Sequence, residues 1–248
     1  MSLDSIRWEF AGQTVVTSPR AGSSRYGLIW LADLVEEPPQ SESWWSGFAA
    51  QGFHVATIFG DGRFWTARQF SPSAPETSSP PSEEAILCDD VIPRILAEWG
   101  TSPRMVALAG NGIGGGAALR IAFRYPERFR VVAAWEPILE WERVFGLGTQ
   151  LDLLYPNPEI CRQDTASMHI HPSQPPSGIW FASCPANQPW HRGADRLAEK
   201  LAAFGVDHTF RELAAPTSLQ CAANRALLIE MQQWLAAQML RSSRSLLD

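Results

Sequence analysis

The chain has 248 residues, 45% of them hydrophobic, and a formal net charge of −6 at pH 7. This length predicts a single domain, 1–248, with a sizeable core. The acidic balance, without long basic blocks, argues against nucleic acid and anionic membrane as partners. No apolar run approaches the roughly 20 residues that cross a bilayer, and the first residues show no secretion-signal pattern, so we expect a cytoplasmic protein.

Strands are predicted where apolar runs are bounded by turn residues. The first two, Ile6–Phe10 and Thr14–Thr17, are typical of a small antiparallel pair. The later runs are almost continuously apolar, as in a parallel sheet that is covered on both faces. These later strands are predicted at Arg25–Ala32, Val55–Gly60, Met105–Ala109, Val131–Trp135, Ile179–Ser183 and His208–Leu213.

Helical patterns alternate with these strands. They lie at Glu84–Trp99, Gly114–Tyr125, Ala194–Phe204 and Asn224–Leu240. The alternation predicts βα units with right-handed crossovers, and therefore an α/β fold with a mostly parallel sheet between helices.

Two stretches interrupt the alternation. Ser71–Ser82 is rich in Pro and Ser and is predicted as a mobile surface loop. Ile138–Ser177 has little periodicity and is predicted as a lid-like insertion. In this fold class, loops at the carboxyl ends of strands hold the binding site, so the insertion lies where a ligand is expected.

One stretch, VALAGNGIGGGAALRIAFRYPERF at Val106–Phe129, joins a strand to a helix through a crowd of glycines. Its segment GNGIG has the glycine spacing of the G-x-S-x-G turn, the elbow that carries a catalytic serine. The serine position is held by Gly112. Glycine tolerates the strained backbone of such a turn but has no side chain that could attack a substrate.

Together with its flanks, this stretch resembles the α/β-hydrolase superfamily, and within it the esterase-D-like branch. DDVIPRILAEW at Asp89–Trp99 is similar to the helix before the elbow strand in that branch. ALRIAFRYPERFRVVAAWEP at Ala118–Pro137 is similar to its elbow helix and the strand that follows. The resemblance covers most of the chain after about Glu84 and implies a three-layer α/β-hydrolase fold with a small lid, in a family of carboxylesterases.

The resemblance also implies where the other triad members would stand. The acid position after the strand Ile179–Ser183 is held by Asn187, and the histidine position after the last strand by Thr217. A triad needs an attacking group, a base and a carboxylate that orients the base. Neither an amide nor a threonine can take these roles, so all three positions depart from the pattern.

The oxyanion region departs as well. The family's H-G after the third strand reads Ala32-Asp33, and the amide that follows the nucleophile position belongs to Ile113. A carboxylate at Asp33 would repel the negative charge that develops in ester hydrolysis. We therefore expect an esterase-like protein without serine-hydrolase activity, which binds a ligand or partner instead.

Two alternatives stay open. A relocated hydrolase site would use Cys184 as nucleophile, His191 as base and Asp33 to orient the base. A buried strand-end cysteine and a histidine engaged in packing are the simpler interpretation of the same residues. The other alternative is a purely structural partner in an oligomer, which includes a homo-oligomer.

The sequence contains 11 tryptophans, and five of them lie near the predicted carboxyl edge of the sheet: Trp44, Trp45, Trp135, Trp141 and Trp190. A pocket rimmed by indole rings could bind an apolar or sugar-like ligand. Packing of the insertion against the sheet would explain the same rings equally well.

No metal site is predicted. His169 and His171 alternate, so they share a face in an extended segment, with Cys161 or Asp164 nearby. Two histidines without a firmly placed third ligand favour packing over zinc. The cysteines, which show no metal-like spacing and are expected to be reduced thiols, are Cys88, Cys161, Cys184 and Cys221.

No cofactor is predicted either. The glycines from Gly112 to Gly116 suggest a dinucleotide turn, but that motif needs an acidic ribose partner about 20 residues on. Glu136 falls later than this spacing requires. The free amides at the start of the helix after Gly112 could still attract a small anion.

Overall fold

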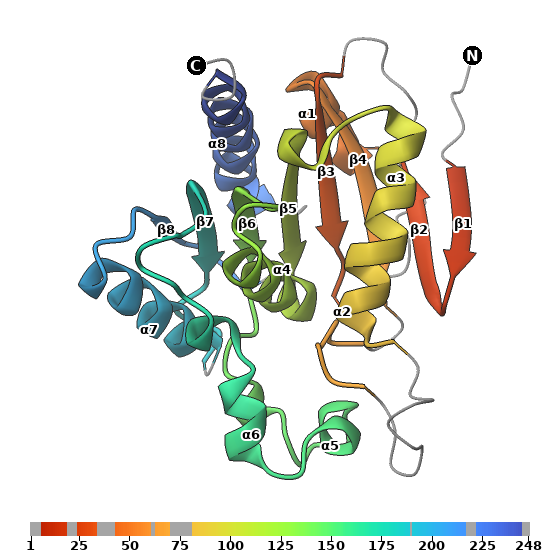
Figure 1. Ribbon diagram of the computed structural model, residues 1–248. Helices are drawn as coiled ribbons and strands as arrows, with labels where there is room; N and C mark the ends of the chain where they lie inside the picture. Colours follow the sequence, from red (N-terminus) through yellow and green to blue (C-terminus); the bar gives the residue numbers. More distant parts are fainter. Residues whose placement is uncertain are drawn as a thin grey trace.

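A computed structural model describes residues 6–18, 24–33, 43–60, 63–69, 81–188, 190–216 and 222–244. These residues form an eight-stranded sheet with the order β1-β2-β4-β3-β5-β6-β7-β8 (Figure 1). The strands are β1 (Ile6–Phe10), β2 (Gln13–Thr17), β3 (Tyr26–Leu31), β4 (Phe53–Phe59), β5 (Val106–Asn111), β6 (Val131–Trp135), β7 (Gly178–Ser183) and β8 (Thr209–Glu212). β2 pairs antiparallel with β1 and β4, and the other neighbouring strands are parallel, which confirms the predicted sheet.

Four predicted helical patterns are present, and the described residues form three further helices, α1, α5 and α6. They are α1 (Ser43–Ala50), α2 (Glu83–Ala85), α3 (Ile92–Trp99), α4 (Gly112–Arg124), α5 (Leu151–Leu154), α6 (Pro158–Gln163), α7 (Trp190–Ala203) and α8 (Arg225–Arg244). A π-helical stretch, Ile86–Val91, joins α2 to α3, so the helix predicted at Glu84–Trp99 is one continuous run. Helix α1 was not predicted from the sequence. Of the predicted loop Ser71–Ser82, residues 71–80 lie outside the described part.

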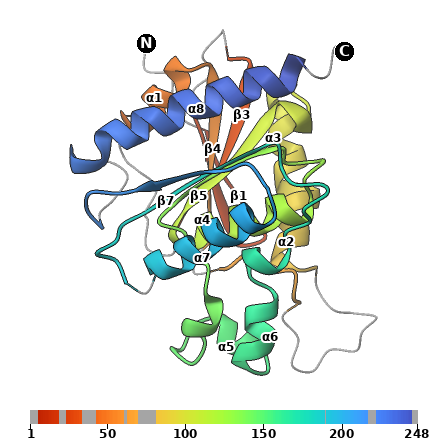
Figure 2. The same ribbon diagram turned by 90° about the vertical axis from the view of Figure 1, so that its left-hand side faces the viewer.

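The sheet separates two hydrophobic cores. On one face, buried residues of α3, α4 and α7 pack against the strands, and on the other face those of α1 and α8 do so. Figure 2 shows α1 and α8 together on one side of the strands, with α3, α4 and α7 on the other. Along β5, Leu108 belongs to the first core while Ala107 and Ala109 belong to the second. Burial on both faces explains why the strands read as continuous apolar runs.

The insertion between β6 and β7, residues 138–177, is called the cap below. It contains α5, α6 and two short 3-10 turns, Trp141–Arg143 and Ala166–Met168. In Figures 1 and 2, α5 and α6 lie beyond the carboxyl ends of the parallel strands. The cap thus takes the position expected of the lid-like insertion.

A buried charge network fastens the cap to α4. The Arg120 side chain is fully buried and pairs with Glu84 of α2 and, at 2.6 Å, with Asp164 of the cap. His169 Nε2 lies 3.2 Å from the Asp164 carboxylate, and the Tyr155 hydroxyl donates to it. Burial alone would raise the pKa of Asp164, but these hydrogen bonds and the Arg120 charge hold it well below its usual range.

Among the described residues, no helix is both long enough and apolar enough to cross a membrane.

Candidate functional site

The predicted elbow is present between β5 and α4. β5 ends at Asn111, whose side-chain oxygen accepts a hydrogen bond from the Trp30 indole at 2.9 Å. The next residue, Gly112, begins α4 with a φ of +53°. This left-handed backbone is accessible to glycine and disfavoured for residues with a Cβ. The turn therefore keeps the geometry in which a nucleophile would be presented, at a residue that has no side chain.

Helix α4 starts immediately beside the end of β3. A Cβ on Gly114 would lie 2.7 Å from the Ala32 carbonyl oxygen and closer still to the backbone of Leu31. Only a residue without a side chain allows this approach. The close packing brings the residue after Ala32 to the mouth of the elbow.

That residue is Asp33, and its carboxylate lies at the start of α4. Asp33 Oδ1 accepts a hydrogen bond from the Ile113 amide at 3.2 Å. A Cβ on Gly112 would lie no more than 2.5 Å from three atoms of the Asp33 carboxylate. An anion is favoured there because the first amides of a helix carry partial positive charge. Asp33 thus fills the volume of a side chain at position 112 and engages the Ile113 amide.

A second carboxylate lies beside Asn187, the residue that the family resemblance puts at the acid position. Glu136, directly after β6, accepts hydrogen bonds from the Asn187 side chain at 2.7 Å and from the Cys184 amide at 2.8 Å. Its φ of +48° is unusual for a residue other than glycine. Burial raises the pKa of Glu136, and the bonds from Asn187 and Cys184 and the nearby His191 oppose the rise only partly.

Glu136 was not predicted as a site residue. In the sequence it suggests only a ribose partner, and its spacing from the glycines does not fit that role. The available signal was its place as the first residue after β6, next to the strand whose end leads to Asn187. A carboxylate therefore reaches Asn187 from the end of the neighbouring strand.

The structure does not assemble the relocated site of Cys184, His191 and Asp33. His191 Nδ1 lies 2.7 Å from the Ser183 hydroxyl, and its Nε2 lies 3.5 Å from Asp195. Cys184 is 1% exposed and belongs to the core on the α8 face. Side chains alternate at the end of β7, so Ser183 and Cys184 point to opposite faces. His191 is therefore turned toward Ser183.

Three of the five tryptophans are core residues rather than parts of a pocket rim. Trp45 is 4% exposed, and Trp135 and Trp141 are 1% exposed. Trp135 stacks on Trp180 with ring centroids 6.1 Å apart. Trp190 is half-buried and packs against the core on the α7 side. The side chain of Trp44 and the whole of Thr217 lie outside the described residues.

The paired histidines of the cap do not share a ligand set. His169 contacts Asp164, whereas His171 is exposed. Within the described part of the chain, no group of three His, Cys, Asp or Glu side chains is placed to hold a metal ion. Cys161 is the buried residue of α6, and burial raises the pKa of its thiol to about 12.

A hollow of about 430 Å³ lies between the cap and α7, away from Gly112. Its charges are largely satisfied within the chain. Glu140 pairs with Arg196 at 2.7 Å, and the Lys200 ammonium donates to the Ser167 carbonyl at 2.6 Å. The hollow is therefore a seam that holds the cap on α7 rather than a set of free binding groups.

Comparison with known proteins gives one family and a common fold. The family model described as "Putative esterase" matches residues 59–215. No curated protein matches the sequence. Among solved structures, a ferulic acid esterase has a TM-score of 0.68 at 12% identity, with 95% of this chain and 97% of that chain covered. An S-formylglutathione hydrolase from Agrobacterium tumefaciens has a TM-score of 0.68 at 13% identity, with 95% and 94% covered.

A third similar structure is the fluorophosphonate-binding serine hydrolase FphF of Staphylococcus aureus. Its TM-score is 0.70 at 11% identity, with 94% of this chain and 97% of that chain covered. Identities this low show the fold alone. Together with the eight-stranded, mostly parallel sheet, these similar structures confirm the expected α/β-hydrolase fold.

Proposed function

Because the chain belongs to the putative esterase family, we propose that it is an esterase-like protein that no longer performs serine hydrolysis and uses the α/β-hydrolase fold for binding. The proposal concerns chemistry at the elbow, where an esterase would hold its nucleophile and its oxyanion site.

The observation that carries the proposal is the position of Asp33 against Gly112. Ester hydrolysis needs an attacking group at the elbow and amide donors free to receive the oxyanion. Here residue 112 has no side chain. The Asp33 carboxylate occupies the adjoining volume and accepts a hydrogen bond from the Ile113 amide. Loss of one oxyanion donor costs about 2.7–4 kcal/mol of transition-state stabilisation, and a fixed negative charge adds repulsion.

The base position supports the same proposal. The sequence contains no histidine after His208, so the segment after β8 has none to supply. Glu136 and Asn187 keep the acid side of the site polar, but the nearby His191 contacts Ser183 and Asp195 instead of a nucleophile at the elbow. Nothing in the described contacts favours the Cys184 alternative, and an oligomeric role stays a prediction.

Turnover of p-nitrophenyl acetate and p-nitrophenyl butyrate tests the proposal. We expect the rate with the protein to equal the buffer rate. The variant Cys184→Ala addresses the relocated site, and Cys161→Ala is its matched control because both thiols are buried. Turnover that Cys184→Ala abolishes and Cys161→Ala preserves would replace the proposal with a cysteine hydrolase. Turnover that survives both substitutions would also refute the proposal, because it would require a nucleophile other than these two thiols.

A further inference from the structure

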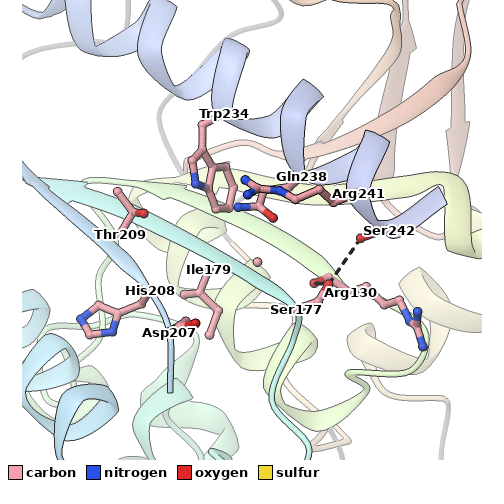
Figure 3. Close-up of a pocket in the computed structure, with 11 residues that line it drawn as sticks. Arg130, Ser177, Ile179, Asp207, His208, Thr209, Trp234, Gln238, Arg241 and Ser242 are labelled. Atoms are coloured by element: carbon pink, nitrogen blue, oxygen red, sulfur yellow. Dashed lines mark hydrogen bonds between the residues drawn. The ribbon is translucent and has the colours of Figure 1, made fainter. Parts of the chain in front are cut away.

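A second hollow, of about 460 Å³, lies at the opposite edge of the sheet from Gly112. It is bounded by α8 and by the residues at the starts of β6, β7 and β8 (Figure 3). Small-molecule pockets have volumes of about 300–1,000 Å³, so this one is large enough for a single small ligand. It shares no residue with the elbow.

One face of α8 supplies the upper wall of this amino-edge pocket. Trp234, Gln238 and Arg241 are spaced four and three residues apart, so they lie on the same side of the helix. Figure 3 shows them in a row, with Thr209 of β8 across from Trp234. A Cβ on Gly178 would lie 3.2 Å from Gln238 and 3.3 Å from Trp234. Glycine at the start of β7 thus leaves room beneath the helix.

The polar side chains of this wall are available to a ligand. Among the described residues, the Trp234, Gln238 and Arg241 side chains form no hydrogen bond or ion pair, and neither does the Thr209 hydroxyl. The seam between the cap and α7 differs in this respect, because its charges pair within the chain. Unpaired donors that converge on a hollow are what a ligand site requires.

The charges of the pocket favour an anion. Two arginines, Arg130 and Arg241, line it against a single carboxylate, Asp207. Arg130 lies 3.6 Å from Glu127, whose side chain is 78% exposed, so this pairing is weak. Arg241 sits in the last turn of α8, where the helix end carries partial negative charge. Together with Asp207, that end disfavours a dianion, so a monoanion fits better than a phosphate.

We propose that the amino-edge pocket binds a small aromatic monocarboxylate. The carboxylate is received by the Arg241 guanidinium, which presents a planar pair of donors, and by the Gln238 amide. The ring lies against the Trp234 indole, since flat rings gain from contact with an aromatic face. The inference names a ligand class for a binding role, but it does not depend on the loss of hydrolysis at the elbow.

Isothermal titration with benzoate tests the site, with acetate, benzyl alcohol and inorganic phosphate as comparison ligands. We expect saturable binding of benzoate, weaker binding of acetate because it has no ring, and none of benzyl alcohol because it has no charge. Phosphate that binds more tightly than benzoate would overturn the assignment. So would absence of any benzoate binding.

Two matched variants locate the site. Arg241→Gln should weaken benzoate binding about tenfold or more, since a hydrogen bond to a charged group is lost. Arg244→Gln removes the same charge from the last turn of α8 outside the pocket lining, and it should leave the affinity unchanged. If both variants weaken benzoate binding equally, the loss comes from the overall charge of the protein, and the proposed site is refuted.

Among the described residues, the Arg241 side chain forms no hydrogen bond or ion pair, so Arg241→Gln should melt like the wild type and a folding failure can be told apart from lost binding. If benzoate does not bind in the amino-edge pocket, the expected result with p-nitrophenyl esters does not change. Either proposal can therefore fail without the other.

Discussion

The contact between Asp33 and the elbow predicts that residue 112 cannot regain a serine without cost. In Gly112→Ser, the new Cβ would lie within 2.5 Å of three carboxylate atoms of Asp33. The backbone φ of +53° adds a second penalty. A left-handed conformation costs a residue with a Cβ about 1–2 kcal/mol, and forcing atoms into a filled site costs about 1–3 kcal/mol. We expect the free energy of unfolding to fall by about 2–5 kcal/mol.

The two penalties can be separated by a double-mutant cycle. Asp33→Ala removes the carboxylate and with it the overlap, so Gly112→Ser in that background should cost only the backbone share, about 1–2 kcal/mol. Gly100→Ser is the matched control. Gly100 also has a positive φ, +63°, but a Cβ there would meet nothing within 4 Å. It should cost about 1–2 kcal/mol in either background.

Urea unfolding of the wild type, the single variants and the double variants measures these differences. If Gly112→Ser lowers the free energy of unfolding equally with and without the Asp33 carboxylate, the predicted overlap between the two residues is absent. The prediction also fails if Gly112→Ser costs no more than Gly100→Ser in the wild-type background.

Further predictions concern the network under the cap and the buried thiols. Arg120→Met leaves Glu84 and Asp164 without their buried cation and should lower the free energy of unfolding by about 3–5 kcal/mol in urea; a loss below about 1 kcal/mol would contradict a buried pair. Asp164 has a depressed pKa in the folded state, so its stabilisation is complete above the pKa of about 3.9 for an unfolded Asp and is lost as the pH falls. Asp164→Asn should therefore make the free energy of unfolding fall less steeply below about pH 4. A variant whose stability falls there as steeply as that of the wild type would contradict this. Burial raises the thiol pKa of Cys88 and Cys161 to about 12, so iodoacetamide at about pH 8 should alkylate them only after unfolding, as peptide mass spectrometry can show.

The sheet could be predicted because its signals are local. Most parallel strands are apolar runs with turn residues beside them, whereas the edge strand β8 reads TFRE and is partly exposed. The long helices have a clear period. Helix α1 escaped because Ser43–Ala50 is short and follows a stretch without a regular pattern. The short helices of the cap escaped for the same reason.

The site was predicted only in part, because it depends on which strands are neighbours. The glycine turn at Gly112 is contiguous in sequence, and its place in the elbow was predicted. Asp33 was expected in the oxyanion region only from the family resemblance, and its contact with the elbow arises because β3 and β5 pair, although they are far apart in the chain. Glu136 meets Asn187 because β6 and β7 pair.

The tryptophans show a different limit. Their positions near strand ends were recognised, but the sequence does not say toward which layer a ring points. Trp135 closes β6 with its side chain in the core under α8, where burial of a large apolar surface is favourable. A position at the edge of the sheet is therefore not evidence for a pocket.

The most direct test of the central claim is to count reactive nucleophiles without relying on substrate fit. A fluorophosphonate reagent forms a covalent adduct with an activated serine, and intact-protein mass spectrometry detects the adduct on the full chain. A serine esterase in the same solution verifies the reagent. We predict that the mass of this protein remains unchanged while the esterase is fully labelled. A stoichiometric adduct on this chain would contradict the claim, and peptide mapping would identify the nucleophile that it retains.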